Sequence, residues 1–313
     1  MVVVSMQLKI WGVRGSIPTP GETTLRYGGN TPCVQVLVPD GPGLPESTSI
    51  VFDAGSGIRV LGNHLAEDIS PEKELTVYLF LSHIHWDHIQ GLPFFKPLYR
   101  ANSHIHLHGP DYENMEEIIR YQMCPNHFPV SMDSDGIKSV LKFHPLEQKP
   151  IQIGSISVRH HFVNHGTEQT VVGYRAESPT GTVVYIPDVE PWDYPSGSLA
   201  DSNGQALAAE KALRDFVRDA DVMLFDSMFC DEEFETYRGW GHSPMEYAVG
   251  VAADAGVKKL GLFHHDPMRD DDDLDRLLVE MQKRGRASGV EVFASKEGMA
   301  IDIDAGTRQK VKT

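Results

Sequence analysis

Cysteine is scarce in this sequence, which has Cys33, Cys124 and Cys230 among its 313 residues and no others. They lie far apart without paired spacing, which argues against a disulfide framework and favours a reducing compartment. Hydrophobic runs long enough to cross a bilayer are also missing. The first ten residues lack the basic leader and long apolar core of a signal peptide and indicate a β-strand. The sequence therefore predicts a cytoplasmic protein without a membrane partner.

Basic residues are also few. The sequence has 28 Lys and Arg residues against 44 Asp and Glu residues, which gives a formal net charge of -16 at pH 7. Binding a long nucleic acid depends on neutralising its phosphates with basic side chains, so this balance argues against such a partner. A small anion can still bind, because a buried pair of metal ions dominates the charge of its immediate surroundings.

Short apolar runs separated by glycine and proline fill both halves of the chain. They predict that each half of the chain is rich in strands first and contains helices later. Strands are expected at residues 8–13, 33–38, 49–52, 75–81, 104–107, 151–158, 170–176, 182–186, 222–225 and 260–263. Helices are expected at residues 58–65, 112–121, 206–220, 244–255 and 272–285.

No linker divides the chain, so the sequence predicts one domain over residues 1–313 with similar halves at about 1–150 and 151–303 and a frayed tail at 304–313. The helix at 244–255 is predicted to have Ser243 as its cap and Pro244 at its first position. The acidic run at 270–273 indicates a solvated helix start, where carboxylates suit the helix dipole.

The densest group of metal-ligand residues is the stretch HIHWDH at residues 83–88, directly after an apolar strand. Because side chains alternate along an extended chain, His83 and His85 point to one side and can hold one cation such as zinc. Asp87 and His88 come one turn later and can reach a second cation. A single histidine here would indicate only a surface turn, but four ligand-type residues predict a metal site.

This pattern resembles the signature of the metallo-β-lactamase superfamily. The resemblance implies later ligands, and the sequence supplies His165, Asp188 and His264 in the family's order, each after an apolar run. By this resemblance two ions are bound, and Asp188 bridges them. The first ion is held by His83, His85 and His165, and the second by Asp87, His88 and His264. The implied fold is α/β (α+β), an αββα four-layer sandwich of two mixed β-sheets flanked by helices.

The last ligand is ambiguous between two neighbouring histidines. We assign it to His264, because the related pattern places the ligand just before a short linker to proline, here Pro267. His265 then lies behind the ligands or faces the substrate. A different set, His104, His106 and His108, alternates along one strand, and we assign it to one face of a sheet rather than to a further metal site.

Further segments resemble the tRNase Z-like and phosphoribosyl cyclic phosphodiesterase-like branch of the superfamily. The chain opens with WGVRGSIP at residues 11–18 and RYGGNTP at 26–32, and VFDAGSG at 51–57 is similar to the family's second-strand motif. In that motif Asp53 can accept a hydrogen bond from a metal-bound histidine. Arg14 and Arg26 either steer phosphate oxygens or form ion pairs. Asn30, like Asp53 and His265, is a candidate neighbour of the metals or the substrate.

The segment with Asp226 and His242 resembles the tRNase Z arrangement, in which an acidic residue and a Gly-His-Ser sequence precede the last metal ligand. This resemblance implies that His242 donates a proton to the leaving oxygen, that Asp226 orients His242, and that Asp87 belongs to the catalytic set. The tRNase Z pattern usually has Glu and His-Ser-Thr, so Asp226 and the His-Ser-Pro sequence argue against tRNA processing. The insertion at 109–136 is expected to act as a lid over a small substrate.

Together these features favour a dinuclear metal-dependent phosphodiesterase acting on a small phosphodiester, such as a cyclic nucleotide or a cyclic ribose phosphate. Two divalent cations about 3.5–4 Å apart clamp such a substrate and generate a bridging hydroxide that attacks phosphorus. The nitrogen and oxygen ligands suit Zn²⁺ and admit Mn²⁺, Fe²⁺ or Ni²⁺. The resemblance also implies a homodimer.

Three alternatives stay open at this stage. A tRNase Z-like nuclease would process RNA 3′ ends with the same ligands. A lactam, lactone or thioester hydrolase would use the same metals on another bond. A ligand sensor would keep the fold without catalysis, although a binding module needs neither two metals nor a labile water.

Overall fold

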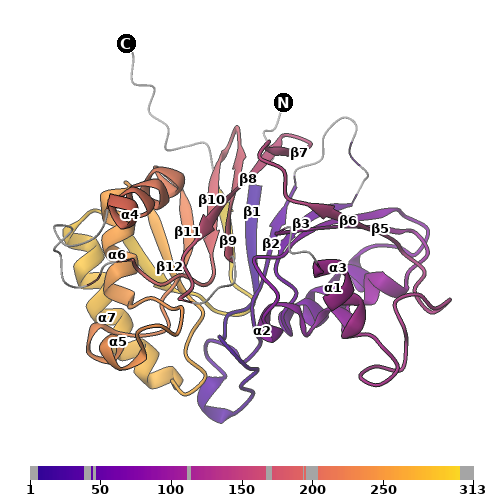
Figure 1. Cartoon of the computed structure of the whole chain (residues 1–313), viewed down its shortest axis with the longest axis horizontal. Helices are drawn as coiled ribbons and strands as arrows, with labels where there is room; N and C mark the ends of the chain where they lie inside the picture. The colour runs from indigo at the N-terminus through magenta and orange to yellow at the C-terminus, as the bar shows by residue number, and fades with distance from the viewer. Residues whose placement is uncertain are drawn as a thin grey trace.

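A computed structural model describes residues 6–38, 44, 47–110, 114–166, 171–192, 194 and 204–303. Within these residues, fourteen strands form two seven-stranded sheets, and seven α-helices accompany them. The sheets pack against each other in the middle of the molecule, and helices cover both outer faces (Figure 1). The expected αββα sandwich of two mixed sheets is therefore confirmed. The predicted tail at 304–313 lies outside the described residues.

The first sheet is built from the first half of the chain and one late strand. Its order is β14 (Ala300–Ile303), β1 (Met6–Gly12), β2 (Cys33–Leu37), β3 (Thr48–Phe52), β4 (Leu75–Phe80), β5 (Ser103–Gly109) and β6 (Val140–Pro145). Pairing is antiparallel from β14 to β3 and parallel from β3 to β6. The helices of this half are α1 (Gly57–Asp68), α2 (Trp86–Ile89) and α3 (Met115–Tyr121).

The second sheet mirrors this plan. Its order is β13 (Glu291–Ala294), β12 (Lys259–Phe263), β11 (Val222–Asp226), β10 (Gly181–Ile186), β9 (Val171–Ser178), β8 (Ile156–Val163) and β7 (Ile151–Ile153). Pairing is parallel from β10 to β13 and antiparallel from β7 to β10. Its helices are α4 (Gly204–Val217), α5 (Asp231–Tyr237), α6 (Met245–Asp254) and α7 (Asp271–Ala287).

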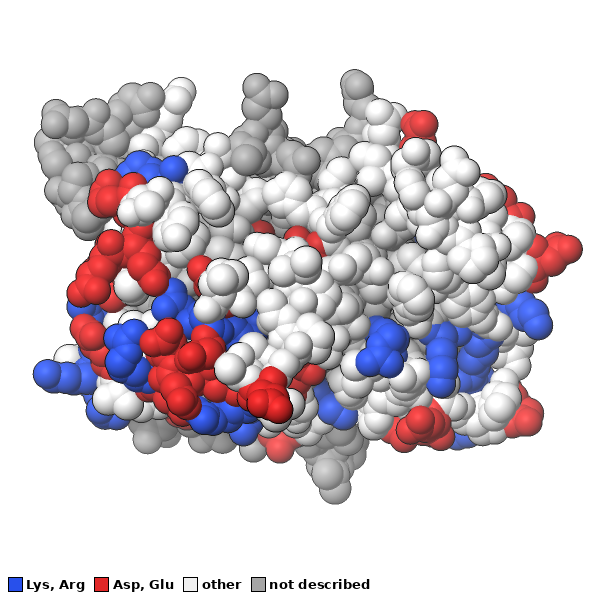
Figure 2. Space-filling model, turned by 90° about the horizontal axis from the view of Figure 1, so that it is seen from below, with Lys and Arg blue, Asp and Glu red and all other residues white. Residues whose placement is uncertain are grey.

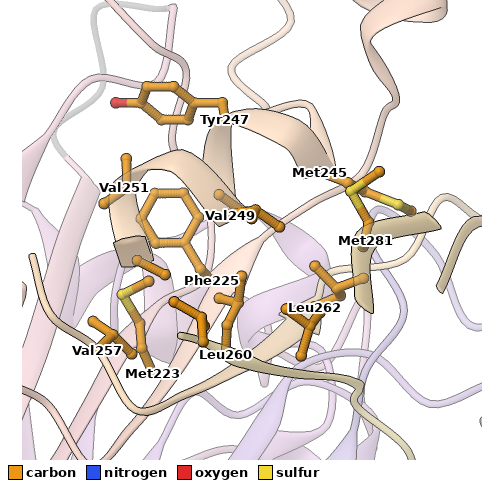
Figure 3. Packing of buried hydrophobic residues seen from close by; sticks show 14 of the residues in the cluster. Met223, Phe225, Met245, Tyr247, Val249, Val251, Val257, Leu260, Leu262 and Met281 are labelled. Atoms are coloured by element: carbon orange, nitrogen blue, oxygen red, sulfur yellow. The ribbon is translucent and has the colours of Figure 1, made fainter. Parts of the chain in front are cut away.

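Alternation along the central strands creates two kinds of core. In β11, Val222 and Leu224 point into the layer between the sheets, whereas Met223 and Phe225 point toward the helices. Figure 3 shows Phe225 packed among apolar side chains of α6, β12 and α7. Burying apolar surface on both faces drives the sandwich together and fixes where each strand ends.

Two local expectations were wrong. The single strand expected at 151–158 is a hairpin of β7 and β8, because Gly154 adopts a left-handed backbone with φ of 57°. Ser243 does not cap α6, since its hydroxyl donates to the carbonyl oxygen of Val189 and Pro244 is the residue that precedes the helix. The acidic run does start a helix, where Asp270 accepts a hydrogen bond from the Asp273 amide at 2.8 Å.

The parallel strands place the candidate site residues together. Parallel strands end on the same edge of their sheet, so Asp53 after β3 and His83 after β4 lie beside each other. In the second sheet, Asp188, Asp226 and His264 stand at or just beyond the ends of β10, β11 and β12. Ligands of open α/β sheets bind at such carboxyl ends. No helix within the described residues is long and apolar enough to span a membrane.

Candidate metal centre

One group of ligand atoms gathers around His85. The distance from His85 Nδ1 to His83 Nε2 is 2.9 Å, and the distance to His165 Nε2 is 3.3 Å. Asp188 Oδ2 lies 3.6 Å from the His83 nitrogen and 3.9 Å from the His165 nitrogen. These four side chains present atoms within 4.8 Å of one another, close enough to share one cation.

A second group lies on the other side of Asp188. The Asp87 carboxylate is 3.2 Å from His88 Nε2 and 3.1 Å from His264 Nε2. Asp188 Oδ1 lies 3.2 Å from the His88 nitrogen and 3.3 Å from the His264 nitrogen. Asp188 therefore presents one oxygen to each group, as a carboxylate that bridges two cations would.

The chemical state of the first ligand group fits a metal centre. Burial lowers the pKa of His83, His85 and His165, which keeps their imidazoles neutral and leaves a nitrogen lone pair for a cation. His88 Nε2 and Asp188 Oδ1 are buried and have no hydrogen-bond partner among the described residues. Unpartnered buried polar atoms are costly, and a divalent cation between them would satisfy both.

Asp53 orients the second group from behind. Its carboxylate receives hydrogen bonds from His88 Nδ1 at 2.7 Å, the Ser82 amide at 2.7 Å and the Tyr185 hydroxyl at 2.8 Å. An ionised carboxylate can only accept, so His88 Nδ1 carries the proton and Nε2 is left facing Asp188. Asp53 also has a left-handed backbone with φ of 59°, which ends β3 sharply.

Glu190 was missed by the sequence analysis and ties together three segments of the site. Its carboxylate accepts hydrogen bonds from the amides of Gly239 at 2.9 Å and Gly241 at 2.8 Å. The carbonyl oxygen of Gly241 in turn accepts one from His165 Nδ1 at 2.7 Å. A Cβ at Gly241 would lie 2.4 Å from the His165 ring, so glycine is required there.

Asp226 and His242 form a buried pair beside the metal groups. His242 Nδ1 lies 2.9 Å from Asp226 Oδ2, which also accepts the Val189 amide at 2.9 Å. The His242 ring stacks on the His264 ring with centroids 4.8 Å apart. Burial lowers the pKa of His242, but the Asp226 carboxylate more than offsets it and raises the pKa to about 9. His242 also forms a third candidate ligand group with Asp188 and His264.

The structure distinguishes the two neighbouring histidines after β12. His264 joins the second ligand group, whereas His265 Nε2 lies 2.9 Å from the carbonyl oxygen of Ser295. A left-handed backbone at His264, with φ of 61°, turns the chain between them. His265 is fully buried and supports the site from behind through backbone hydrogen bonds to Val13 and Gly15.

Three residues expected near the metals or the substrate have partners within the protein. Arg14 is fully buried, donates to the carbonyl oxygens of Gly28, Asp266 and Arg269, and lies 3.6 Å from Asp271. Arg26 pairs with Asp272 at 3.0 Å and with Asp275. The Asn30 side chain donates to Glu297 at 2.8 Å. Both arginines therefore have ion-pair partners, which is one of the two alternatives that the sequence left open.

The histidines of β5 and the insertion also have packing contacts. His106 Nδ1 is 3.0 Å from His144 Nε2, and its ring stacks on Tyr78. In the insertion, Gln122 donates to the carbonyl oxygen of Ile89 in α2 at 3.3 Å, and Phe128 packs edge-on against Phe94. The insertion is therefore anchored beside α2, which carries Asp87 and His88.

A family model described as the Beta-lactamase superfamily domain matches residues 48–265. The chain belongs to this superfamily. Ribonuclease Z of Exiguobacterium sibiricum is 24% identical over 284 residues, covering 78% of this chain and 84% of that protein. The fold also matches the metallo-β-lactamase fold protein YhfI of Bacillus subtilis, with a TM-score of 0.64, 20% identity and coverage of 95% and 99%. Unliganded yeast PDE1 matches with a TM-score of 0.64, 15% identity and coverage of 96% and 100%.

Family membership and the His/Asp groups identify the chain as a metal-dependent hydrolase. The superfamily resemblance of the sequence is thereby confirmed.

The two adjacent histidines give a matched test of the ligand assignment. We expect His264→Gln to reduce the metal that survives dialysis, because it removes a nitrogen from the second group. His265→Gln should retain the metal and lower the melting temperature, because His265 contacts Ser295 rather than the ligand atoms. Elemental analysis and thermal unfolding of both variants measure these effects. Metal loss in His265→Gln with full retention in His264→Gln would contradict the assignment.

Proposed function

We propose that this chain is a dinuclear phosphodiesterase that hydrolyses a small phosphodiester. The observation that carries the proposal is the place of the Asp226–His242 pair, stacked on His264 beside the two-sided carboxylate of Asp188. In this proposal the pair supplies the proton that the leaving oxygen of a phosphodiester needs. Hydrolysis of a thioester would not need this donor, because a thiolate leaves without a proton, whereas the nitrogen of a lactam would need one as well.

Each part of the site has a separate task in this proposal. Two bound divalent cations supply Lewis acidity and lower the pKa of water toward neutrality. Asp53 and Gly241 orient the ligand histidines His88 and His165 through their outer nitrogens. Asp226 accepts a hydrogen bond from His242 Nδ1, so Nε2 is the atom from which His242 would deliver a proton to the leaving oxygen.

The size of the substrate separates this proposal from its main alternative. The relatives named ribonuclease Z favour an RNA substrate. Against this, the net charge of -16 opposes a long polyanion. Figure 2 views the molecule from the side on which α2 lies in Figure 1, and it shows basic side chains in separate groups away from a mostly uncharged middle. We therefore favour a cyclic nucleotide or a cyclic ribose phosphate, with RNA 3′ processing as the second candidate.

The proposal includes the metal, the assembly and the insertion. Mixed imidazole and carboxylate ligands suit Zn²⁺ and admit Mn²⁺, Fe²⁺ or Ni²⁺. We propose two ions per chain, a homodimer in the cytoplasm, and a lid role for the insertion at 109–136, whose contacts with Ile89 and Phe94 place it next to the ligand segment.

A substrate panel on metal-loaded protein tests the function directly. It contains bis(p-nitrophenyl) phosphate, cyclic nucleotides, a precursor tRNA and representative lactam, lactone and thioester substrates. We expect turnover of bis(p-nitrophenyl) phosphate and the cyclic nucleotides, and none of the carbonyl compounds. Efficient cleavage of the tRNA with slow turnover of the small esters would replace the proposal with the nuclease, and turnover of a carbonyl substrate alone would overturn it.

The role of His242 predicts a dependence on the leaving group. His242→Ala should lower kcat by about 10²- to 10⁴-fold for alkyl leaving groups, which need a proton, and much less for p-nitrophenolate. Metal content should not change, because Asp188 and His264 keep their other partners. Steady-state kinetics on matched aryl and alkyl phosphodiesters measure the effect. An equal loss on both substrates, or loss of metal, would argue that His242 is a ligand instead.

Glu190 should act through His242 as a positioning residue. Glu190→Gln replaces one acceptor oxygen by an NH2 group, and if this group takes the place of Oε1 it opposes the Gly239 amide, so the loop of residues 239–242 shifts. We expect kcat to fall about 10-fold with the same leaving-group dependence as His242→Ala. Glu297→Gln is the matched control, since Glu297 holds Asn30 in a similar way. A uniform loss on all substrates would indicate a purely structural role for Glu190.

A further inference from the structure

Two tryptophans of this chain are exposed beside the metal centre. The Trp86 side chain is 83% exposed and Trp240 is 63% exposed, whereas Trp11 is buried and donates to Gln35. Within the described residues, the indole of Trp86 has neither a hydrogen bond nor a ring contact, and the one aromatic ring that contacts the Trp240 indole is that of Tyr237. Leaving such large apolar rings in water forgoes stabilisation that burial would give, which calls for a binding role.

Both tryptophans are next in sequence to residues of the candidate metal centre. Trp86 stands between His85 of the first ligand group and Asp87 of the second. Trp240 precedes Gly241, whose carbonyl oxygen accepts a hydrogen bond from His165. The ligand atoms of His85 and His165 are 3.3 Å apart, so each tryptophan is one residue away from a group that contacts His165. Each half of the chain thus has one exposed tryptophan next in sequence to a residue that contacts His165.

Two further exposed apolar side chains belong to segments that carry residues of the site. Ile17, which is 58% exposed, follows the residue whose amide donates to Asp87, and Met268, which is 89% exposed, comes four residues after His264. Exposed apolar side chains of this kind suit a flat, uncharged ring attached to a phosphate.

We propose that Trp86 and Trp240 form a stacking site for the nucleobase of a nucleotide substrate whose phosphodiester lies at Asp188. Stacking on an aromatic face accepts any base, because every base has a flat π surface. The inference rests on the proposed phosphodiesterase function and deepens it, since it selects base-bearing phosphodiesters over base-free ribose phosphates. Neither indole takes part in the bond cleavage.

Two substrates that differ by one nucleoside test the site. Thymidine 5′-(p-nitrophenyl phosphate) and methyl p-nitrophenyl phosphate share the phosphodiester and the leaving group, so the ratio of their kcat/KM values reports recognition of the base. We expect the ratio to exceed one in the native protein and to fall about 10-fold in Trp86→Ala and in Trp240→Ala. Any loss of metal affects both substrates alike and cancels in the ratio.

Trp192→Ala is the matched control, because Trp192 is 54% exposed and lies outside the proposed stacking site. Its ratio should equal that of the native protein, and Trp86→Phe should recover most of the native ratio. Hydrolysis of both substrates with a ratio that no tryptophan substitution changes would overturn the stacking site alone. If metal-loaded protein hydrolyses neither substrate, the proposed function is contradicted, and so is the stacking site that depends on it.

Discussion

The buried carboxylate of Asp188 is the constraint on which the rest of the site depends. It is 1% exposed, and its two oxygens face separate groups of imidazole nitrogens from both halves of the chain. Within the part of the chain that the structure describes, its Oδ1 has no hydrogen-bond partner. The geometry is favourable only when positive charge lies on each side of it.

The fold positions this carboxylate because parallel strands of both sheets end at the site. β4 leads to His83, β10 to Asp188 and β12 to His264, and apolar packing on both faces of each sheet fixes those ends. Outer hydrogen bonds then set the ring orientations, with Asp53 behind His88 and Gly241 behind His165. Because these supports are buried, the imidazoles are held ready before any ligand arrives, which is how preorganised sites gain affinity and rate.

The candidate ligand groups could be predicted because their chemistry is local. Each lies just after an apolar run, and a dense sequence such as HIHWDH has few other uses. Glu190 could not be predicted, because it acts on amides 49 and 51 residues away and a lone glutamate in a turn carries no pattern. The hydrogen-bond partners of Arg14 could not be predicted either, because two of the carbonyl oxygens that accept from it belong to residues 252 and 255 positions later in the chain. The hairpin at Gly154 was missed because a single glycine within apolar alternation resembles a continuous strand.

The most direct test of the account is a crystal structure of the zinc-loaded protein with anomalous diffraction data. The account predicts two strong anomalous peaks on either side of Asp188, one touching His83, His85 and His165 and the other touching Asp87, His88 and His264. A single peak, or two peaks that leave the Asp188 carboxylate without contact to both ions, would contradict it.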